Sequence, residues 1–345
     1  MSFEDAIIDS QKYSKRHLIL GNGFSIGCFP EIFNYPSLFN QINFDQILQL
    51  REAFRVLGTY DFEVVIKALE NSRNILPIYM RDPIIIKEID SHINRLKEVL
   101  IQTISKNHPA LPSEITENQY QKCQVFLNYF LSGSEKSGHI YTLNYDLLLY
   151  WVLMHNNLII SKNDGFGNIE DELDASHVVW QGLTNSVGMQ RIHFLHGAMH
   201  LFDAGYELKK YSWRRKGISL IEQIRQSIAK NEFPLFVSEG TYQQKMNKIK
   251  HHDYLSHSYR SLMANCKTKS CFFIYGHSLA DNDEHILKRL GKGCFPKLYV
   301  SIYDDHNSEN NRLIMNRANK LCLLRNNKCP LTVSFYDAKS ANVWG

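Results

Sequence analysis

Short apolar runs alternate with amphipathic stretches along this sequence of 345 residues. Six runs rich in Ile, Phe, Tyr and Leu are predicted to form buried strands; they cover residues 17–20, 140–143, 192–195, 271–275, 297–303 and 331–336. Most lack the period-two alternation of a strand with one solvated face, as expected for parallel strands that helices cover on both faces. The pattern predicts an α/β fold with a doubly wound, mostly parallel, Rossmann-like sheet of about six strands. The run 234–237 is a candidate seventh strand, at an edge or outside the sheet.

Between about residues 45 and 132 the apolar positions recur at three- and four-residue spacing, as they do on one face of a helix. We therefore expect a helical insertion module at 45–132 and a sheet domain formed by 1–44 and 133–345. The segment 161–191 is expected to form an irregular loop or a small excursion before the third strand. Asp281 and Ser308 are residue types that favour the N-cap position, so helices are expected to begin near them.

Composition and charge exclude several classes of protein. The formal net charge is +4, which is far from the basic balance of a domain devoted to nucleic acid. No run approaches the ~20 apolar residues of a membrane span, and no secretory leader is recognisable, so we expect neither secretion nor membrane insertion. The seven cysteines are odd in number and never spaced as Cys-x-x-Cys, which predicts neither a disulfide framework nor a zinc ribbon. A reducing cytoplasm fits this pattern best.

The first predicted strand runs into a glycine turn, Gly21-Asn22-Gly23-Phe24-Ser25. Glycines at such a turn let backbone N–H groups approach a diphosphate while the next helix presents its positive end. The glycine spacing is GxGxxxG rather than the GxGxxG of ordinary dehydrogenases, and no acidic residue is clearly placed ~20 residues further on. On this motif alone, nucleotide binding and a simple tight turn are equally supported.

Polar or glycine-rich segments also follow the next four predicted strands. They contain, in chain order, Asn144 and Asp146, then His196 and Gly197, then Gly276 and Ser278, and finally Asp304. Each segment has a structural explanation as well, because Asn and Asp favour helix N-caps and a lone histidine is more often structural than catalytic. Five such strand ends favour a ligand site, since the carboxyl ends of parallel strands converge on one crevice.

The order of these motifs resembles that of the sirtuin superfamily. GNGFS, TLNYD, LHG and the turn GHS stand where sirtuins carry GAGxS, a QNID-type segment, a strand ending in HG, and GTS, over about residues 16–305. In detail the motifs are more similar to the sirtuin-like domains of bacterial anti-phage systems, which show TNYD and a GxSLxDxD turn. The resemblance implies an NAD-binding catalytic domain that hydrolyses NAD to nicotinamide and ADP-ribose, as the effector of an abortive-infection defence.

The resemblance also implies roles for matching positions. Asn144 would hold the nicotinamide ribose or its attacking water, Asp146 would face the carboxamide, and His196 would serve as general base. The implied nucleotide-binding residues are Gly21, Asn22, Gly23, Phe24, Ser25, Gly276, Ser278 and Asp304. These roles suit the cleavage of an N-glycosidic bond, whose transition state is oxocarbenium-like and needs an oriented nucleophile.

Two departures from the sirtuin pattern keep other activities open. Asn22 stands where sirtuins have a small alanine, and the four-cysteine zinc module of the deacylases is absent, which leaves an acyl-lysine channel unsupported. A metal is not expected, including at the histidine-rich stretch 251–257. The alternatives are a zinc-free deacylase, an ADP-ribosyltransferase, and a non-catalytic subunit that senses NAD or ADP-ribose. The resemblance further implies a homo-oligomer and a HerA-type ATPase partner, with no membrane or direct nucleic-acid contact.

Overall fold

The computed structural model describes the chain except for residues 46, 81, 133–137, 156–162, 167–176, 183–189, 206, 212–217, 239–240 and 326. Its centre is a six-stranded sheet in the order β4-β2-β1-β7-β8-β9, and every neighbouring pair is parallel. These strands are β1 (Lys15–Leu20), β2 (Ile140–Thr142), β4 (Ile192–Phe194), β7 (Ser270–Tyr275), β8 (Lys297–Ile302) and β9 (Thr332–Asp337). All six coincide with predicted strands to within two residues at either end, so the predicted α/β fold is confirmed.

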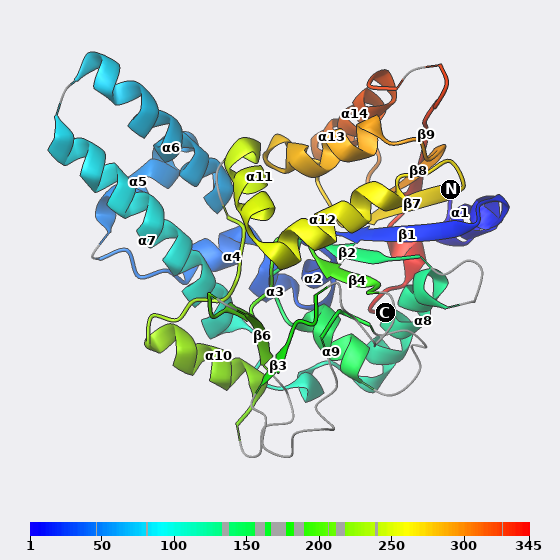
Figure 1. The fold of residues 1–345 in the computed structure, drawn as a ribbon, viewed down its shortest axis with the longest axis horizontal. Coiled ribbons are helices and arrows are strands. Elements are labelled where there is room, and N and C mark those ends of the chain that lie inside the picture. The colour runs from blue at the N-terminus through cyan, green and yellow to red at the C-terminus, as the bar shows by residue number, and fades with distance from the viewer. Residues whose placement is uncertain are drawn as a thin grey trace.

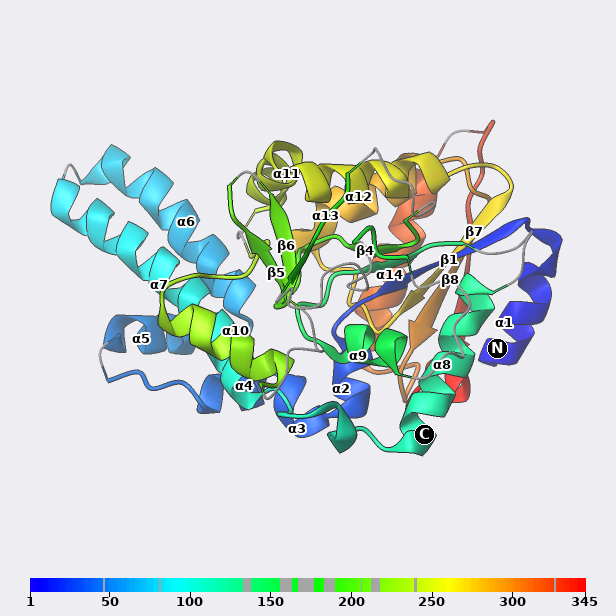
Figure 2. The same ribbon diagram turned by 60° about the horizontal axis from the view of Figure 1, so that its bottom comes forward.

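Helices cover the sheet on both faces, with α11 to α14 on one side and α1, α8 and α9 on the other (Figure 2). The helices are α1 (Phe3–Asp9), α2 (Gly23–Cys28), α3 (Pro30–Phe33), α4 (Tyr35–Asn40), α5 (Leu48–Leu57), α6 (Phe62–Tyr79), α7 (Pro83–Asn107), α8 (Glu117–Leu131), α9 (Leu148–Met154), α10 (Leu220–Ala229), α11 (Tyr242–His251), α12 (Asp253–Asn265), α13 (Glu284–Lys292) and α14 (Glu309–Leu323). Every residue of β7 and β8 is buried, which explains why both strands are apolar apart from Ser270, Lys297 and Ser301.

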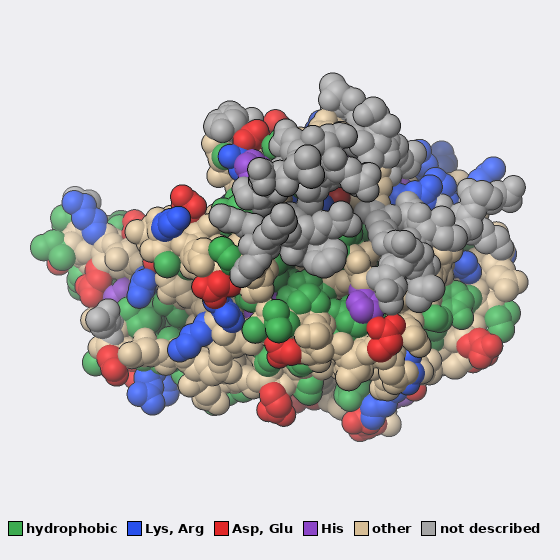
Figure 3. All heavy atoms as spheres, turned by 90° about the horizontal axis from the view of Figure 1, so that it is seen from below, with side chains coloured by type: hydrophobic (Ala, Val, Ile, Leu, Met, Phe, Trp, Pro, Cys, Tyr) green, Lys and Arg blue, Asp and Glu red, His purple; other side chains and the backbone are tan. Residues whose placement is uncertain are grey.

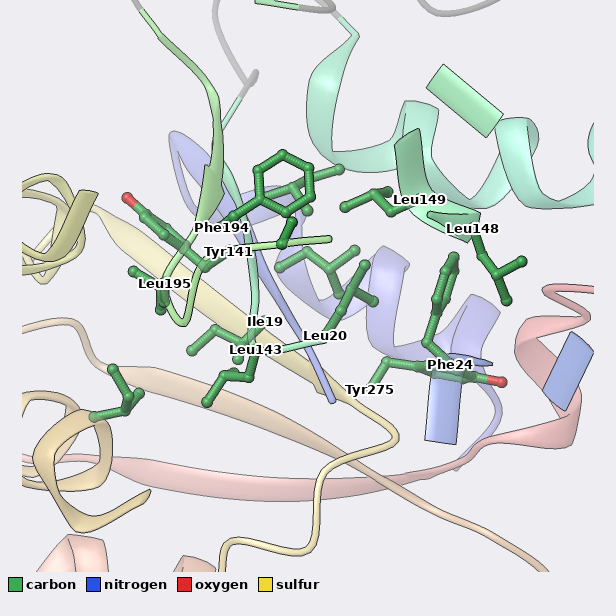
Figure 4. Close-up of a cluster of buried hydrophobic side chains, with 14 of the residues drawn as sticks. Ile19, Leu20, Phe24, Tyr141, Leu143, Leu148, Leu149, Phe194, Leu195 and Tyr275 are labelled. Atoms are coloured by element: carbon green, nitrogen blue, oxygen red, sulfur yellow. The ribbon is translucent and has the colours of Figure 1, made fainter. Parts of the chain in front are cut away.

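The strand order places a topological switch point between β1 and β7. The chain runs outward from β1 to β2 and β4, then returns to β7 beside β1 and continues to β8 and β9. Ligands of open α/β sheets bind at the carboxyl ends of the strands beside such a switch point. Side chains of Ile19, Leu20, Tyr141 and Phe194 fill the core next to these strand ends, together with Phe24 of α2 (Figure 4).

The predicted helical module contains α5, α6 and α7, and the antiparallel pair α6 and α7 projects away from the sheet (Figure 1). Asp61 caps α6 by accepting hydrogen bonds from the N–H groups of Glu63 and Val64. The last helix of the expected insertion, α8, instead packs against β1. The division into 1–44 with 133–345, and 45–132, stays a prediction.

Some local predictions need correction. A second, antiparallel sheet in the order β3-β6-β5 comprises β3 (His177–Val179), β6 (Leu208–Tyr211) and β5 (Leu201–Asp203), and no pattern predicted it because strands of three or four residues show no period. β3 falls in the expected excursion 161–191, most of which lies outside the described residues. The run 234–237 forms no strand; Phe236 makes an isolated bridge with Gly197.

The two predicted helix starts have different outcomes. Ser308 caps α14 as expected, its side chain accepting from the N–H of Asn311. At Asp281 the chain instead forms a short 3-10 turn, Asp281–Asp283, and α13 begins only after it.

The expectation of no disulfide is wrong, because Cys294 is bonded to Cys329, with a Cα–Cα distance of 5.0 Å. The two cysteines stand three residues before β8 and β9, whose first residues, Lys297 and Thr332, are paired in register. Strand pairing, which cysteine spacing does not reveal, brings them together. The other five cysteines are free thiols.

Surface features are consistent with the modest charge. Lys and Arg side chains lie interspersed with Asp and Glu on the face seen in Figure 3. None of the helices described here combines the length and apolar character needed to cross a bilayer.

A row of buried histidines crosses three strands of the sheet. His17 of β1 accepts a hydrogen bond from the backbone N–H of His139 (3.0 Å), and Nδ1 of His139 lies 3.1 Å from Nε2 of His193 in β4. Burial lowers the pKa of His139 to about 4 and lowers that of His17 and His193 well below the usual 6.5. The row is therefore neutral in the folded protein at pH 7.

These histidines predict acid lability. As the pH falls through about 6.5, these histidines take up protons in the unfolded chain but stay neutral in the folded chain. The stability contributed by the neutral row is therefore fully present above that pH and is lost progressively below it. Each buried histidine adds a slope of up to ~1.4 kcal/mol per pH unit. Urea unfolding at pH 5 to 8 should therefore show a stability that declines steeply below about pH 6.5. A free energy of unfolding that holds steady from pH 7.5 to 5.5 would contradict the neutral row.

Candidate functional site

Two glycine loops meet at the switch point, backbone against backbone. A Cβ on Gly21 would lie 2.7 Å from the carbonyl oxygen of Gly276, and one on Gly23 would lie 2.6 Å from the Cα of Gly276. Gly276 itself has a φ of +65°, a backbone conformation that residues other than glycine rarely adopt. The N–H of Gly23 donates to the oxygen of Gly276 at 2.7 Å. Glycine is thus required at all three positions by the close approach of the two loops.

Asn144 and Asp146 of the second strand end lie directly on the glycine turn. Nδ2 of Asn144 donates to the carbonyl oxygen of Gly21 (3.0 Å) and to Oγ of Ser25 (2.9 Å), and Oγ of Ser25 donates to Asp146 (2.5 Å). The other oxygen of Asp146 accepts from the N–H of Leu148 at the start of α9. The hydrogen bonds run in one direction, from Asn144 through Ser25 to Asp146.

The electrostatics of this chain follow from its burial. All three side chains are buried, and burial raises the pKa of Asp146, against the lowering effect of its hydrogen bonds from Ser25 and Leu148. Both hydrogens of the Asn144 amide are engaged, whereas its Oδ1 accepts no hydrogen bond from the described residues. Asn144 therefore has one acceptor left for a ligand.

His196 lies at the same edge of the sheet, at the end of β4. Its ring is 2% exposed; Nε2 is 3.0 Å from Nε2 of His285 in α13 and 3.7 Å from Oδ1 of Asp283. The next residue, Gly197, has a φ of +81°, and a Cβ there would lie 1.9 Å from the oxygen of Leu235. The chain thus turns sharply just after His196 and leaves the imidazole at the strand end.

Asp283 connects His196 to a buried ionic cluster, which consists of Glu63, Lys245, His277 and Asp283. Nζ of Lys245 is 2.8 Å from Glu63 and 3.1 Å from Asp283, and Nε2 of His277 is 3.0 Å from Asp283. Lys245 is fully buried. The cluster joins α6 of the helical module, α11 and the loop that follows β7.

The charges of Lys245 and Asp283 support each other, whereas burial raises the pKa of Glu63 to about 7 despite the nearby ammonium of Lys245. Burial disfavours the carboxylate of Asp283, but Lys245 and the hydrogen bond from His277 hold its pKa well below the usual range. Burial likewise disfavours the ammonium of Lys245, but the carboxylates of Glu63 and Asp283 outweigh it and raise its pKa. Burial lowers the pKa of His285 to about 4 and that of His196 well below its usual value. Both imidazoles are therefore neutral at pH 7.

His196, Asp283 and His285 present two imidazoles and a carboxylate, with their ligand atoms within 4.8 Å of one another. A metal here would take both Nε2 lone pairs and leave both ring protons on Nδ1. Nδ1 of His285 is enclosed and has no partner among the described residues, although histidines that bind metals almost always donate their second N–H. Lys245 also brings a positive charge to Asp283. The geometry favours a hydrogen bond between the imidazoles over a metal ion.

The remaining predicted nucleotide-binding residues point elsewhere in this structure. Asn22 donates to the carbonyl oxygen of Phe33 (3.0 Å), and Phe24 is a core residue whose carbonyl accepts from Trp344. Ser278 and Asp304 are exposed, and they contact Arg317 and Lys339. The structure thus groups Gly21, Gly23, Ser25, Asn144, Asp146 and Gly276, with His196 at the same edge.

Sequence reasoning missed three members of this region: Glu63, Lys245 and His285. Glu63 and Lys245 belong to amphipathic helices, where a charged residue is normally assigned to the solvated face. The available signal was weak: His285 stands two residues after Asp283, which ends the polar turn 276–283 after the fourth predicted strand.

Comparisons with known proteins identify a family and a similar solved structure. A family model described as a domain of unknown function, DUF4917, matches residues 18–344. Among solved structures, the chain is similar to one titled "Structural Basis for the Mechanism and Regulation of Sir2 Enzymes", at 13% identity and a TM-score of 0.37, over 93% of this chain and 97% of that chain. No curated protein matches.

Proposed function

The chain belongs to the family of unknown function DUF4917, and from the geometry of its site we propose that it binds NAD and hydrolyses the nicotinamide–ribose bond. The observation that carries this proposal is the position of Asn144. Its amide nitrogen is tied to the glycine turn by two hydrogen bonds, which leaves its oxygen for a ribose hydroxyl or a water.

The binding half of the proposal rests on the sheet. A crevice beside the switch point of this strand order is where doubly wound folds hold dinucleotides. The loops carrying Gly21, Gly23 and Gly276 lie there, and their lack of side chains lets the two loops pack backbone against backbone beside that crevice.

The chemical half needs three functions near the ribose. In our proposal Asn144 orients the attacking water, and the buried carboxylate of Asp146 stabilises the positive charge that develops on the ribose. The water oxygen bonds to the anomeric carbon as nicotinamide leaves with the electrons of the broken bond. His196, which is neutral at pH 7, takes the proton of the water.

We infer that the described arrangement is a closed state of the site, because two of its proposed catalytic side chains are buried. Asp146 and His196 are buried, and two cavities among the described residues lie elsewhere. One is lined by residues of α4, α5 and the following turn, including Phe39, Arg51 and Tyr60, and the other by residues of α7 and α10. NAD therefore enters only after segments over the sheet edge move.

Product analysis tests this proposal. Purified protein incubated with NAD, followed by liquid chromatography and mass spectrometry, should yield nicotinamide and free ADP-ribose. O-acyl-ADP-ribose or ADP-ribose retained on protein would indicate a transferase instead. Tight binding of NAD without any product would indicate a sensing subunit.

The wider role in anti-phage defence is part of the proposal and rests on the sequence resemblance. An enzyme that depletes NAD has to be held inactive until infection, by oligomerisation or by a partner such as a HerA-type ATPase. The hairpin of α6 and α7 exposes Ile75, Ile78, Tyr79 and Ile84, and clustered exposed apolar side chains mark contact surfaces. Mass photometry of a stable, fully active monomer would contradict this regulation.

A further inference from the structure

The contact between His196 and His285 contains information about where their protons lie. Their Nε2 atoms are 3.0 Å apart, which is a hydrogen-bond distance. Each ring is neutral and carries a single proton, on either Nδ1 or Nε2. One ring therefore donates and the other accepts, and the surroundings of the two Nδ1 atoms decide which.

Nδ1 of His285 is fully enclosed and has no hydrogen-bond partner in the part of the chain that the structure describes. A proton placed there would be a buried N–H without an acceptor, which proteins avoid more strictly than an unpaired acceptor. The proton of His285 therefore lies on Nε2 and is donated to Nε2 of His196. The proton of His196 then lies on its Nδ1, which is not one of the enclosed atoms without a partner.

We propose that His285 caps the general base: in the closed state its Nε2–H occupies the lone pair of His196 that must take up the proton. This inference rests on the proposed function, because it concerns the same histidine. It makes His285 a gating residue that slows the reaction until the first turn of α13 moves.

The ionic cluster fixes this cap in place. Asp283 stands two residues before His285 and is held by Lys245 and His277 at 3.1 and 3.0 Å. Its Oδ1 lies 3.7 Å from the same Nε2 of His196. Once the cap leaves and His196 accepts a proton, this carboxylate stabilises the imidazolium. A ligand that shifts the loop between β7 and α13 therefore uncaps the base.

Two substitutions of His285 separate capping from other roles. His285→Ala removes the donor, and His285→Gln places an amide N–H at about the reach of the histidine Nε2. We expect His285→Ala to raise the initial rate of NAD cleavage about fivefold, the factor for loss of one ordinary hydrogen bond, and His285→Gln to stay within about twofold of the wild type. His251→Ala, on the exposed end of α11, is the matched control. A rate that falls in His285→Ala, with an unchanged melting temperature, would overturn the cap.

The position of the proton is measured independently of turnover. In protein labelled with ¹⁵N-histidine, NMR should show His196 protonated on Nδ1, its signal assigned by its loss in His196→Gln. Protonation on Nε2 would overturn the inference. If neither the wild type nor His285→Ala cleaves NAD and His196 is protonated on Nδ1, the proposed hydrolysis fails while the assigned hydrogen bond stands.

Discussion

Replacing His196 by alanine should reduce NAD turnover by ~10²–10⁴-fold, the usual contribution of a placed general base. The reason is geometric: His196 is the titratable group at the end of β4, neutral at pH 7 and within reach of a carboxylate that stabilises its protonated form. NAD affinity should change little, since the glycine turn and Asn144 remain. Initial rates from chromatography, with affinity from calorimetry, check both expectations.

A second variant distinguishes loss of the general base from loss of folding. His196→Gln keeps an amide near His285 but has no nitrogen that takes up a proton at neutral pH. It should melt near the wild-type temperature and be as inactive as the alanine variant. Turnover within tenfold of the wild type in His196→Gln would remove His196 from the mechanism.

Replacing Lys245 by methionine should have the largest effect on stability, about 3–5 kcal/mol. Methionine has a similar length but no charge, so the buried carboxylates of Glu63 and Asp283 would face each other without the ammonium that now lies 2.8 and 3.1 Å from them. Urea denaturation at pH 7.5 gives the free energy of unfolding directly.

The same helix provides a control for this substitution. Lys250→Met changes an exposed lysine of α11 and should alter stability by no more than ~0.5 kcal/mol. Adding Glu63→Gln to Lys245→Met removes one of the two stranded charges and should recover part of the loss. Equal stabilities for Lys245→Met and Lys250→Met would show that the buried ionic cluster contributes nothing to the fold.

The central sheet was predictable because its strands are buried on both faces. A continuous apolar run such as Cys271 to Tyr275 of β7 predicts a strand rather than a loop. Polar residues at the carboxyl ends of such strands can then be placed at one edge of the sheet, because the strands are parallel. For this reason the sequence places Asn144 and Asp146 at the same sheet edge as the glycine turn.

The features that the sequence did not predict depend mostly on contacts between segments far apart in the chain. Glu63 and Lys245 are separated by 182 positions, and their pairing requires the helical module to fold back over the sheet edge. The Cys294–Cys329 bond required the pairing of β8 with β9. The directions of Asn22 and Phe24, toward α3 and the core, follow from local packing that a motif does not record.

The ionic cluster also suggests why the helical module belongs to this site. Glu63 lies in the first turn of α6 and contacts both Lys245 and Asn282. A displacement of the α6–α7 hairpin would therefore move Glu63 and, through Lys245, shift Asp283 beside the proposed base. In this account, a partner or second subunit on that hairpin has a direct physical connection to the chemistry.

A crystal structure with ADP-ribose bound is the most direct test of the central claim, because the proposed product occupies the site without being consumed. We expect the diphosphate to lie over the turn at Gly21 to Gly23 and the terminal ribose to lie within hydrogen-bond distance of Oδ1 of Asn144. ADP-ribose bound in another cavity of the crystal structure would contradict this placement. Failure of the protein to bind ADP-ribose in solution, at a concentration that would saturate such a site, would also contradict it.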